Sequence, residues 1–308
     1  MMNKLGRVQL TPSMIPNSPN FDVKDSTFFS KWSQLPSPKE VRAQAEAQNL
    51  LGVNPDNRKI HSSTIPSIRP PPVIFKNMRL FIKWGSAVRI SEAQCLYTVR
   101  RFLQDNVPVP EVYGWRTDAD EKFIYMEYTE GQTLEKIWDV MESHDRVSIC
   151  HELRIIYDNL RRLEQDLSDP FIGKIAFHIN YMSEAGPFAT VRDFHDWFTF
   201  LHRRPMSDPY SIPVEPFRHD LPDNSTIKLT HGDLHRSNII ITSLPPYRTL
   251  AIVDWEQSGW LPAYWEARKA QYTADRSEEW SIQHLPIILD QYPNTWDPWD
   301  YYTMAMGC

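Results

Sequence analysis

The sequence is poor in cysteine, in long apolar runs and in positive charge, and each shortage argues against a class of protein. Its 308 residues hold three scattered cysteines, Cys95, Cys150 and Cys308, with no Cys-x-x-Cys pair. A disulfide framework is therefore not expected, and a reducing, cytoplasmic setting is. No apolar run approaches a membrane span, and the first residues lack an apolar signal core. The net charge of -6 argues against nucleic acid or an anionic membrane as the main partner.

The rest of the composition is that of an ordinary globular protein, with 41% hydrophobic and 23% charged residues. Residues 1–36 are rich in Pro, Ser and Asn, which predicts an extended arm. A helix should follow, with Ser37 as its N-cap, Glu40 completing a capping box and Gly52 near its end. Strands should then dominate up to residue 128 around one helix, and helices should dominate after that.

Two segments in the C-terminal half carry residues with chemistry. Residues 230–238 read THGDLHRSN, and residues 250–256 read LAIVDWE. They place Asp233, then Asn238 five residues later, then Asp254 after an apolar run. In phosphoryl transfer one Asp positions the attacking hydroxyl, while an Asn and a second Asp hold Mg²⁺ against the nucleotide phosphates. Asp233 is thus the candidate catalytic residue, and Asn238 and Asp254 are the candidate metal ligands.

Local structure should bring the two candidate metal ligands together. Residues 239–242 and 250–253 both predict short buried strands, and the pair of prolines between them favours a hairpin connection. An antiparallel pair places Asn238, just before the first strand, close to Asp254, at the end of the second. Mg²⁺ is usually held by one or two protein carboxylates plus phosphate oxygens, and this arrangement can supply them.

A second interpretation of the same run is a metal-dependent hydrolase. His231, Asp233 and His235 alternate, so on a strand all three would project from one face and could bind a metal. Gly232 and the polar residues that follow favour a loop instead. The hydrolase interpretation also leaves the Asn and the second Asp without a role. A polar turn with no chemistry is the third interpretation.

The sequence of these motifs resembles that of the aminoglycoside phosphotransferase-like (choline kinase-related) family, and in particular its large fungal branch. The matching segments are HGDLHRSN with DWE downstream, RPPPV at 69–73, FIKWG at 81–85, PVPEVYG at 108–114 and YWEARKA at 264–270. The resemblance implies an α+β, two-lobed protein-kinase-like fold with ATP and Mg²⁺ as cofactors. A small antiparallel-sheet lobe would precede a larger, mainly helical lobe.

Domain boundaries follow from the resemblance. It implies an N-terminal extension with one helix at 1–52, a nucleotide-binding lobe at 53–127, and a lobe at 128–308 with the catalytic loop and the acceptor site. At the junction, Met126 and the backbone of Glu127 and Tyr128 would meet the adenine.

The small lobe should supply a lysine to the α/β-phosphates. Lys83 lies in the apolar strand 80–84, where a charge is conspicuous, although an edge-strand lysine facing solvent is the alternative. Glu92 is its expected carboxylate partner, in the first turn of an amphipathic helix. A Glu at that place also suits the helix dipole without any partner.

The Gly-rich loop that covers the phosphates in protein kinases is missing. Between Gly6 and Gly85 the only glycine is Gly52, and residues 62–67, SSTIPS, are the best substitute. Related phosphotransferases also lack a strict glycine pattern, so ATP-dependent phosphoryl transfer remains the leading function. The missing loop nevertheless keeps a second function open, that of a catalytically silent kinase-like binding protein.

The segment after Asp254 is too short for the peptide-docking platform of a protein kinase. Residues 255–308 contain no Ala-Pro-Glu marker, and a helix is expected almost at once with Pro262 as its first residue. A small hydroxyl-bearing acceptor is therefore favoured, such as an aminoglycoside, an amino alcohol or a sugar-like molecule. Six of the eleven tryptophans also lie in this segment. They either bind an organic cation together with nearby carboxylates or form core.

Overall fold

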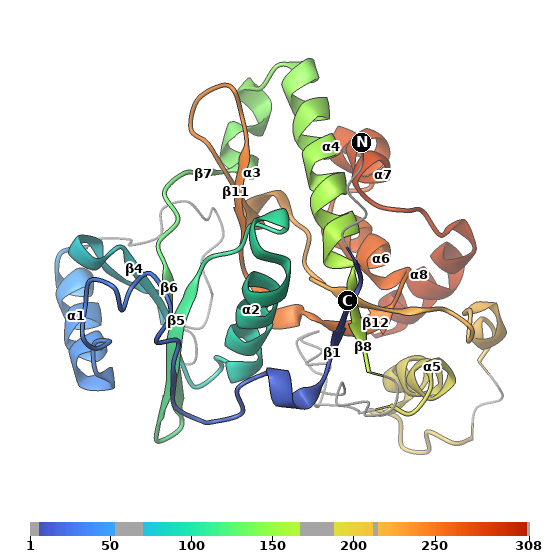
Figure 1. Cartoon of the computed structure of the whole chain (residues 1–308). Coiled ribbons are helices and arrows are strands. Elements are labelled where there is room, and N and C mark those ends of the chain that lie inside the picture. Colours follow the sequence, from blue (N-terminus) through green and yellow to red (C-terminus); the bar gives the residue numbers. More distant parts are fainter. Residues whose placement is uncertain (1–5, 53–69, 167–187, 212–214, 307–308) are drawn as a thin grey trace. The chain divides into compact units, whose positions relative to one another are not determined.

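The structure is a computed structural model, and it describes residues 6–52, 70–166, 188–211 and 215–306. The chain forms two compact units (Figure 1). We call Pro12–Asn159 with His235–Glu256 the sheet unit, and Met1–Thr11, Leu160–Leu234 and Gln257–Cys308 together the helical unit. The candidate phosphate loop at residues 62–67 lies outside the described ranges.

A five-stranded antiparallel sheet is the centre of the sheet unit. Its spatial order is β2 (Phe21–Asp22), β5 (Val112–Asp118), β6 (Glu121–Glu127), β4 (Leu80–Gly85) and β3 (Val73–Phe75). In β4 the side chains of Leu80 and Ile82 are fully buried, whereas those of Phe81 and Lys83 are half-buried. This alternation is the period of a strand, and it turns Lys83 to the face opposite the apolar core.

Two helices of the sheet unit accompany this sheet. α1 (Pro38–Leu50) begins with the expected capping box, in which Ser37 and Glu40 accept each other's backbone N–H. α2 (Ile90–Leu103) contacts β5 and β6, as Figure 1 shows. Glu92 lies in its first turn and is buried.

A second, three-stranded sheet in the same unit contains the hairpin predicted from the sequence. Its order is β11 (Thr249–Ile252), β10 (Ile239–Ile241) and β7 (Gln132–Thr133), all antiparallel. Ile239 is paired with Ile252, so the start of β10 lies beside the end of β11. The helices α3 (Leu134–Ile137) and α4 (Ser143–Leu160) follow β7.

The helical unit contains two strand pairs in its described residues. β1 (Val8–Leu10) runs parallel to β8 (Leu163–Gln165), and β9 (Ile227–Thr230) is antiparallel to β12 (Gly259–Pro262). Its helices are α5 (Val191–Phe200), α6 (Trp265–Thr273), α7 (Leu285–Ile288) and α8 (Trp296–Ala305), with a π-helical turn at Trp280–His284. Aromatic side chains of α5, α6 and α8 pack together as its core, among them Phe198, Trp265 and Trp299.

A buried histidine connects α5 to the start of α6. His195 is fully buried, with Nδ1 2.9 Å from Asp223 Oδ1 and Nε2 2.8 Å from the Tyr264 hydroxyl. Burial lowers the pKa of His195, and the neighbouring Asp223 opposes this only in part. The neutral ring therefore donates from one nitrogen and accepts at the other.

The structure corrects two sequence expectations about local structure. Residues 6–36 are no free arm, because β1 and β2 are paired in sheets and Phe28 and Leu35 are buried. Pro262 does not begin a helix. It ends β12 opposite Ile227, where the missing N–H of proline is tolerated, and α6 starts at Trp265. Within the described ranges, no helix has both the length and the apolar character needed to cross a bilayer.

Candidate functional site

The strand pair β10–β11 positions the two candidate metal ligands. Asn238 closes a turn just before β10, and its carbonyl accepts the backbone N–H of Val253 at 2.9 Å. The next residue, Asp254, has a φ of 68°, in the left-handed region that few residues other than glycine adopt. Asn238 is buried and Asp254 half-buried. The predicted proximity of these two residues is thus confirmed.

Lys83 lies at the centre of a cluster of carboxylates in the sheet unit. Its Nζ is 2.7 Å from Asp254 Oδ1, 2.9 Å from Glu92 Oε2 and 3.2 Å from Glu256 Oε2. The lysine comes from β4, Glu92 from α2, and the other two from the segment that follows β11. The ion pair between Lys83 and Glu92 that the sequence predicted is present.

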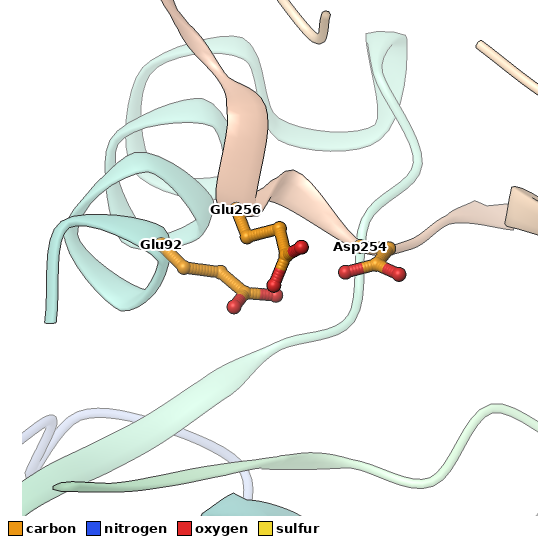
Figure 2. Close-up of side chains that lie close together, drawn as sticks. All are labelled: Glu92, Asp254 and Glu256. Atoms are coloured by element: carbon orange, nitrogen blue, oxygen red, sulfur yellow. The ribbon is translucent and has the colours of Figure 1, made fainter. Parts of the chain in front are cut away.

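Three carboxylates therefore face a single ammonium. Carboxylate oxygens of Glu92, Asp254 and Glu256 lie within 4.8 Å of one another, and Figure 2 shows the three side chains gathered at one place. Burial would lower the pKa of Lys83, but the three negative charges outweigh it and hold that pKa well above its ordinary value. Burial raises the pKa of Glu92 to about 7, against the opposing effect of Lys83. The surplus negative charge and the hard oxygen donors are what a divalent cation such as Mg²⁺ requires.

The backbone N–H groups of Glu127 and Tyr128, two residues expected at the adenine, are already hydrogen-bonded to other residues of the sheet unit. The N–H of Glu127 donates to the Glu111 carbonyl at 2.8 Å, and the N–H of Tyr128 donates to the Arg79 carbonyl at 2.8 Å. Met126 is buried beside them. A backbone hydrogen bond between either residue and a ligand would therefore be accepted by a carbonyl oxygen and not donated by an N–H group.

The candidate catalytic loop is anchored in the helical unit by a residue that the sequence did not single out. Glu266, in the first turn of α6, accepts the backbone N–H of His231 at 2.7 Å and that of Gly232 at 3.2 Å. The ring of His231 then accepts the backbone N–H of Asp233 at 3.2 Å. Glu266 is 1% exposed, and burial raises its pKa, although His231 and the two N–H donors oppose this. His231 thus braces the loop, as the sequence suggested.

Gly232 is required where this loop turns. Its φ is +78°, and a Cβ at that position would lie 2.5 Å from the carbonyl oxygen of Gln257. No other residue fits both the left-handed backbone and the close approach.

The geometry does not favour the metal-hydrolase interpretation. Residues 231–235 form a loop instead of a strand, so their side chains do not alternate across one face. Across the described ranges, one group of acidic, His or Cys side chains is close enough to share a metal, and it consists of Glu92, Asp254 and Glu256. His231, Asp233 and His235 do not belong to it.

Glu256 and Glu266 are therefore the site residues that sequence reasoning missed. The sequence pointed to both only weakly, since each is an acidic residue inside one of the segments that resemble the family, DWE and YWEARKA. Acidic residues in turns and first helical turns are usually solvated, so the signal alone did not distinguish them.

Comparison with known proteins assigns the chain to a family. Residues 89–302 match the model of the phosphotransferase enzyme family, APH. The chain belongs to this family. No curated protein of similar sequence was found. With the family known, the expected α+β, protein-kinase-like fold class is confirmed, with an N-terminal antiparallel sheet followed by a mainly helical region.

Several solved structures of aminoglycoside phosphotransferases are similar to this APH-family chain. The streptomycin–ATP complex of APH(2")-IIa is 13% identical, with a TM-score of 0.48 and 76% of each chain covered. A thermostable mutant of APH(4)-Ia, in ternary complex with ADP and hygromycin B, is 14% identical, with a TM-score of 0.49 over 86% of this chain and 84% of that one. Aminoglycoside-3'-phosphotransferase of type VIII is also 14% identical, with a TM-score of 0.49 over 80% of this chain and 91% of that one.

Proposed function

We propose that this APH-family protein is an ATP- and Mg²⁺-dependent phosphotransferase that moves the γ-phosphoryl group to a hydroxyl of a small molecule. One observation carries the proposal. Residues from β4, α2 and the β10–β11 hairpin, far apart in the sequence, converge on Lys83 and Asp254 in a member of a phosphotransferase family.

Asn238 and Asp254 are the proposed metal ligands, with Glu256 as a further carboxylate of the same cluster. All three supply the hard oxygens that Mg²⁺ prefers. When bound, Mg²⁺ would shield the charge of the nucleotide phosphates. The ammonium of Lys83 would then move from Asp254 to the α/β-phosphates of the nucleotide. Glu92 would hold the lysine side chain in the correct orientation.

Asp233 is the proposed base that orients the acceptor hydroxyl and takes its proton. Phosphoryl transfer has a loose transition state in which the acceptor proton leaves late, so a strong base is not required. The bonds from His231 and Gly232 to Glu266 support this role, because they fix the backbone immediately before Asp233. A rigid loop holds the base at the right distance from the hydroxyl.

For the nucleotide base, we propose that Met126 packs against the adenine while carbonyl oxygens of Glu127 and Tyr128 accept from its amino group. The assignment of residues 53–127 to a nucleotide-binding lobe and of 128–308 to an acceptor-binding lobe is part of the same proposal. We also propose the choline kinase-related, fungal placement within the family, which rests on segments such as YWEARKA.

The acceptor class is proposed as a small hydroxyl compound, such as an aminoglycoside, an amino alcohol or a sugar-like molecule. β12 starts at Gly259 and α6 at Trp265, so little chain after Asp254 is free to dock a peptide. The tryptophans of this segment do not argue for a cation site. Five of the six are buried, namely Trp255, Trp260, Trp265, Trp280 and Trp299, and they form core.

The test is ADP release from ATP across a panel of aminoglycosides, amino alcohols and sugars. Asp233→Asn should abolish acceptor-dependent turnover and leave Mg²⁺·ATP binding intact, whereas Asp220→Asn, an exposed Asp of the same unit, should change neither. Unchanged turnover in Asp233→Asn would contradict the assignment.

A second measurement separates catalysis from silent binding. The chain should show a rise in thermal midpoint with ATP that depends on Mg²⁺, and Asp254→Ala should lose it while Asp120→Ala, at an exposed turn, keeps it. A Mg²⁺-dependent rise without turnover on any acceptor would support the silent binding protein instead.

A further inference from the structure

Arg268 is a buried cation without a hydrogen-bond partner in the described part of the chain. It lies on α6 and is 1% exposed. None of its three guanidinium nitrogens is hydrogen-bonded within the described ranges. Arginine is rarely buried unless it is paired, so this side chain calls for an explanation.

The surroundings of Arg268 stabilise its charge only in part. Its guanidinium lies 3.6 Å from the ring centroid of Trp296, a cation–π contact that stabilises the charge. The carboxylate of Asp300 is held by Arg276, with N–O distances of 2.6 and 2.5 Å. Burial lowers the pKa of Arg268 to about 10. The side chain is therefore still charged at neutral pH.

A second polar atom without a partner lies one turn further along the same helix. Gln271 follows Arg268 by three residues, so the two side chains share a face of α6. Its Nε2 donates to Gln291 Oε1 at 2.8 Å, but its buried Oε1 has no hydrogen bond within the described ranges. Buried donors and a buried acceptor thus lie on one helix face.

Burial of a charge is strongly unfavourable unless hydrogen bonds compensate it, and a cation–π contact supplies none to the guanidinium N–H groups. We propose that Arg268 is the core of a binding site for an oxyanion, a small molecule carrying a carboxylate or a phosphate group. The planar guanidinium can donate two parallel N–H bonds to such a group, which is the strongest pairing available to it. A protonated carboxyl or a phosphate hydroxyl of the same ligand could also donate to Gln271.

The ligand enters from the side of Trp296 and Arg276. Trp296 is half-buried, and the side chain of Arg276 is 53% exposed and lies 5.9 Å from the centroid of the same ring. The proposal therefore requires these two side chains to move when the ligand binds, and it requires no movement of Phe198, Trp265 or Trp299. Neither Arg268 nor Gln271 belongs to the Lys83 cluster or to the hydrogen bonds that anchor the Asp233 loop.

The test uses inorganic phosphate and acetate as probes, with thermal midpoints measured at constant ionic strength. The whole chain should show a saturable rise with at least one probe, and comparison of the two distinguishes a phosphate ligand from a carboxylate ligand. Arg268→Met, which removes the charge at similar volume, should weaken the response at least about tenfold. Lys83→Met should keep it, which excludes the proposed nucleotide site as the origin.

Controls make each outcome decisive. Arg204→Met removes an exposed arginine of the same unit and should leave the response unchanged. Arg268→Lys keeps the charge without the planar fork, so a weakened response in this variant supports the proposal even where Arg268→Met does not fold. No saturable response of the unaltered chain to either probe, or an equal response in Arg268→Met, overturns the proposal and leaves enclosed water as the partner of Arg268.

Discussion

The Nζ atom of Lys83 lies 2.7 Å from Asp254 Oδ1, closer than to any oxygen of Glu92 or Glu256. The ammonium therefore neutralises the same oxygens that would bind a divalent cation. At such distances the interaction between unit charges amounts to several kcal/mol even when partly screened. Lys83 and a metal ion must then compete for Asp254 as long as no nucleotide phosphate draws the lysine away.

Lys83→Met tests this competition directly. In the absence of nucleotide the variant should bind Mg²⁺ at least about tenfold more tightly, which corresponds to roughly 1.4 kcal/mol, because three carboxylates lose their internal cation. Isothermal titration with Mg²⁺ measures the change. Lys31→Met, at an exposed position of the same unit, should titrate like the unaltered chain, and unchanged affinity in Lys83→Met would contradict the competition.

Glu266→Gln should separate catalysis from folding. The amide keeps one acceptor oxygen but turns an NH₂ group toward the second backbone N–H, so the loop before Asp233 is held less firmly. Removal of a buried charge offsets part of the lost bonding, and we expect stability to fall by about 1 kcal/mol. The kcat for acceptor-dependent ADP release should fall at least about tenfold, with the KM for ATP nearly unchanged. Glu279→Gln, which is exposed, is the control; a change in KM alone would speak against positioning.

Gly232→Ala should destabilise the chain more than Gly52→Ala. Both glycines have positive φ values, but a Cβ at Gly52 meets nothing within 4 Å, whereas at Gly232 it meets the Gln257 carbonyl at 2.5 Å. Gly52→Ala should lower the free energy of unfolding by about 1 kcal/mol through backbone strain alone. Gly232→Ala adds a clash and should lower it by roughly 2–4 kcal/mol. Chemical denaturation of the two variants gives the comparison, and equal effects would show that the loop around Gly232 adjusts freely.

His195 should make the stability depend on pH in the acidic range. Its pKa in the folded chain lies below the ordinary value of 6.5, so on acidification the unfolded chain takes up a proton first. Stability is then full above pH 6.5 and falls as the pH drops toward the folded-state pKa. In His195→Gln the loss of stability between about pH 7.5 and about pH 5 should be smaller than in the unaltered chain. Thermal midpoints at both values test it, with His219→Gln as the exposed control.

Sequence reasoning predicted those parts of the fold that depend on chain neighbours. The capping box of Ser37 and Glu40 acts over one helical turn, and the β10–β11 hairpin closes over a few residues, so local patterns were sufficient. The pairing of β1 with β8 joins segments far apart in the chain, and no local sequence pattern predicts it. Pro262 was misplaced because proline is suited both to the start of a helix and to the end of a strand.

In the candidate site, the sequence identified residues that stand in motifs of known spacing. Lys83 pairs with Glu92 as expected, and Asn238 lies beside Asp254 at the ends of the two strands. The ion pair between Lys83 and Asp254 was not predicted. The roles of Asp233 and of residues 126–128 stay predictions. Glu256, Glu266 and Arg268 were not foreseen, because their importance depends on burial, and the burial of a charged side chain is decided by tertiary packing.

The left-handed backbone of Asp254 has a consequence for engineering. A residue with a Cβ holds this conformation at a disadvantage of about 1–2 kcal/mol, which glycine does not have. Asp254→Gly would recover this energy but would lose the ion pair between Asp254 and Lys83, which amounts to several kcal/mol even when partly screened. Relief of the backbone strain alone therefore does not stabilise the chain at this position, and a strain-free residue is tolerated only where Lys83 is changed with it.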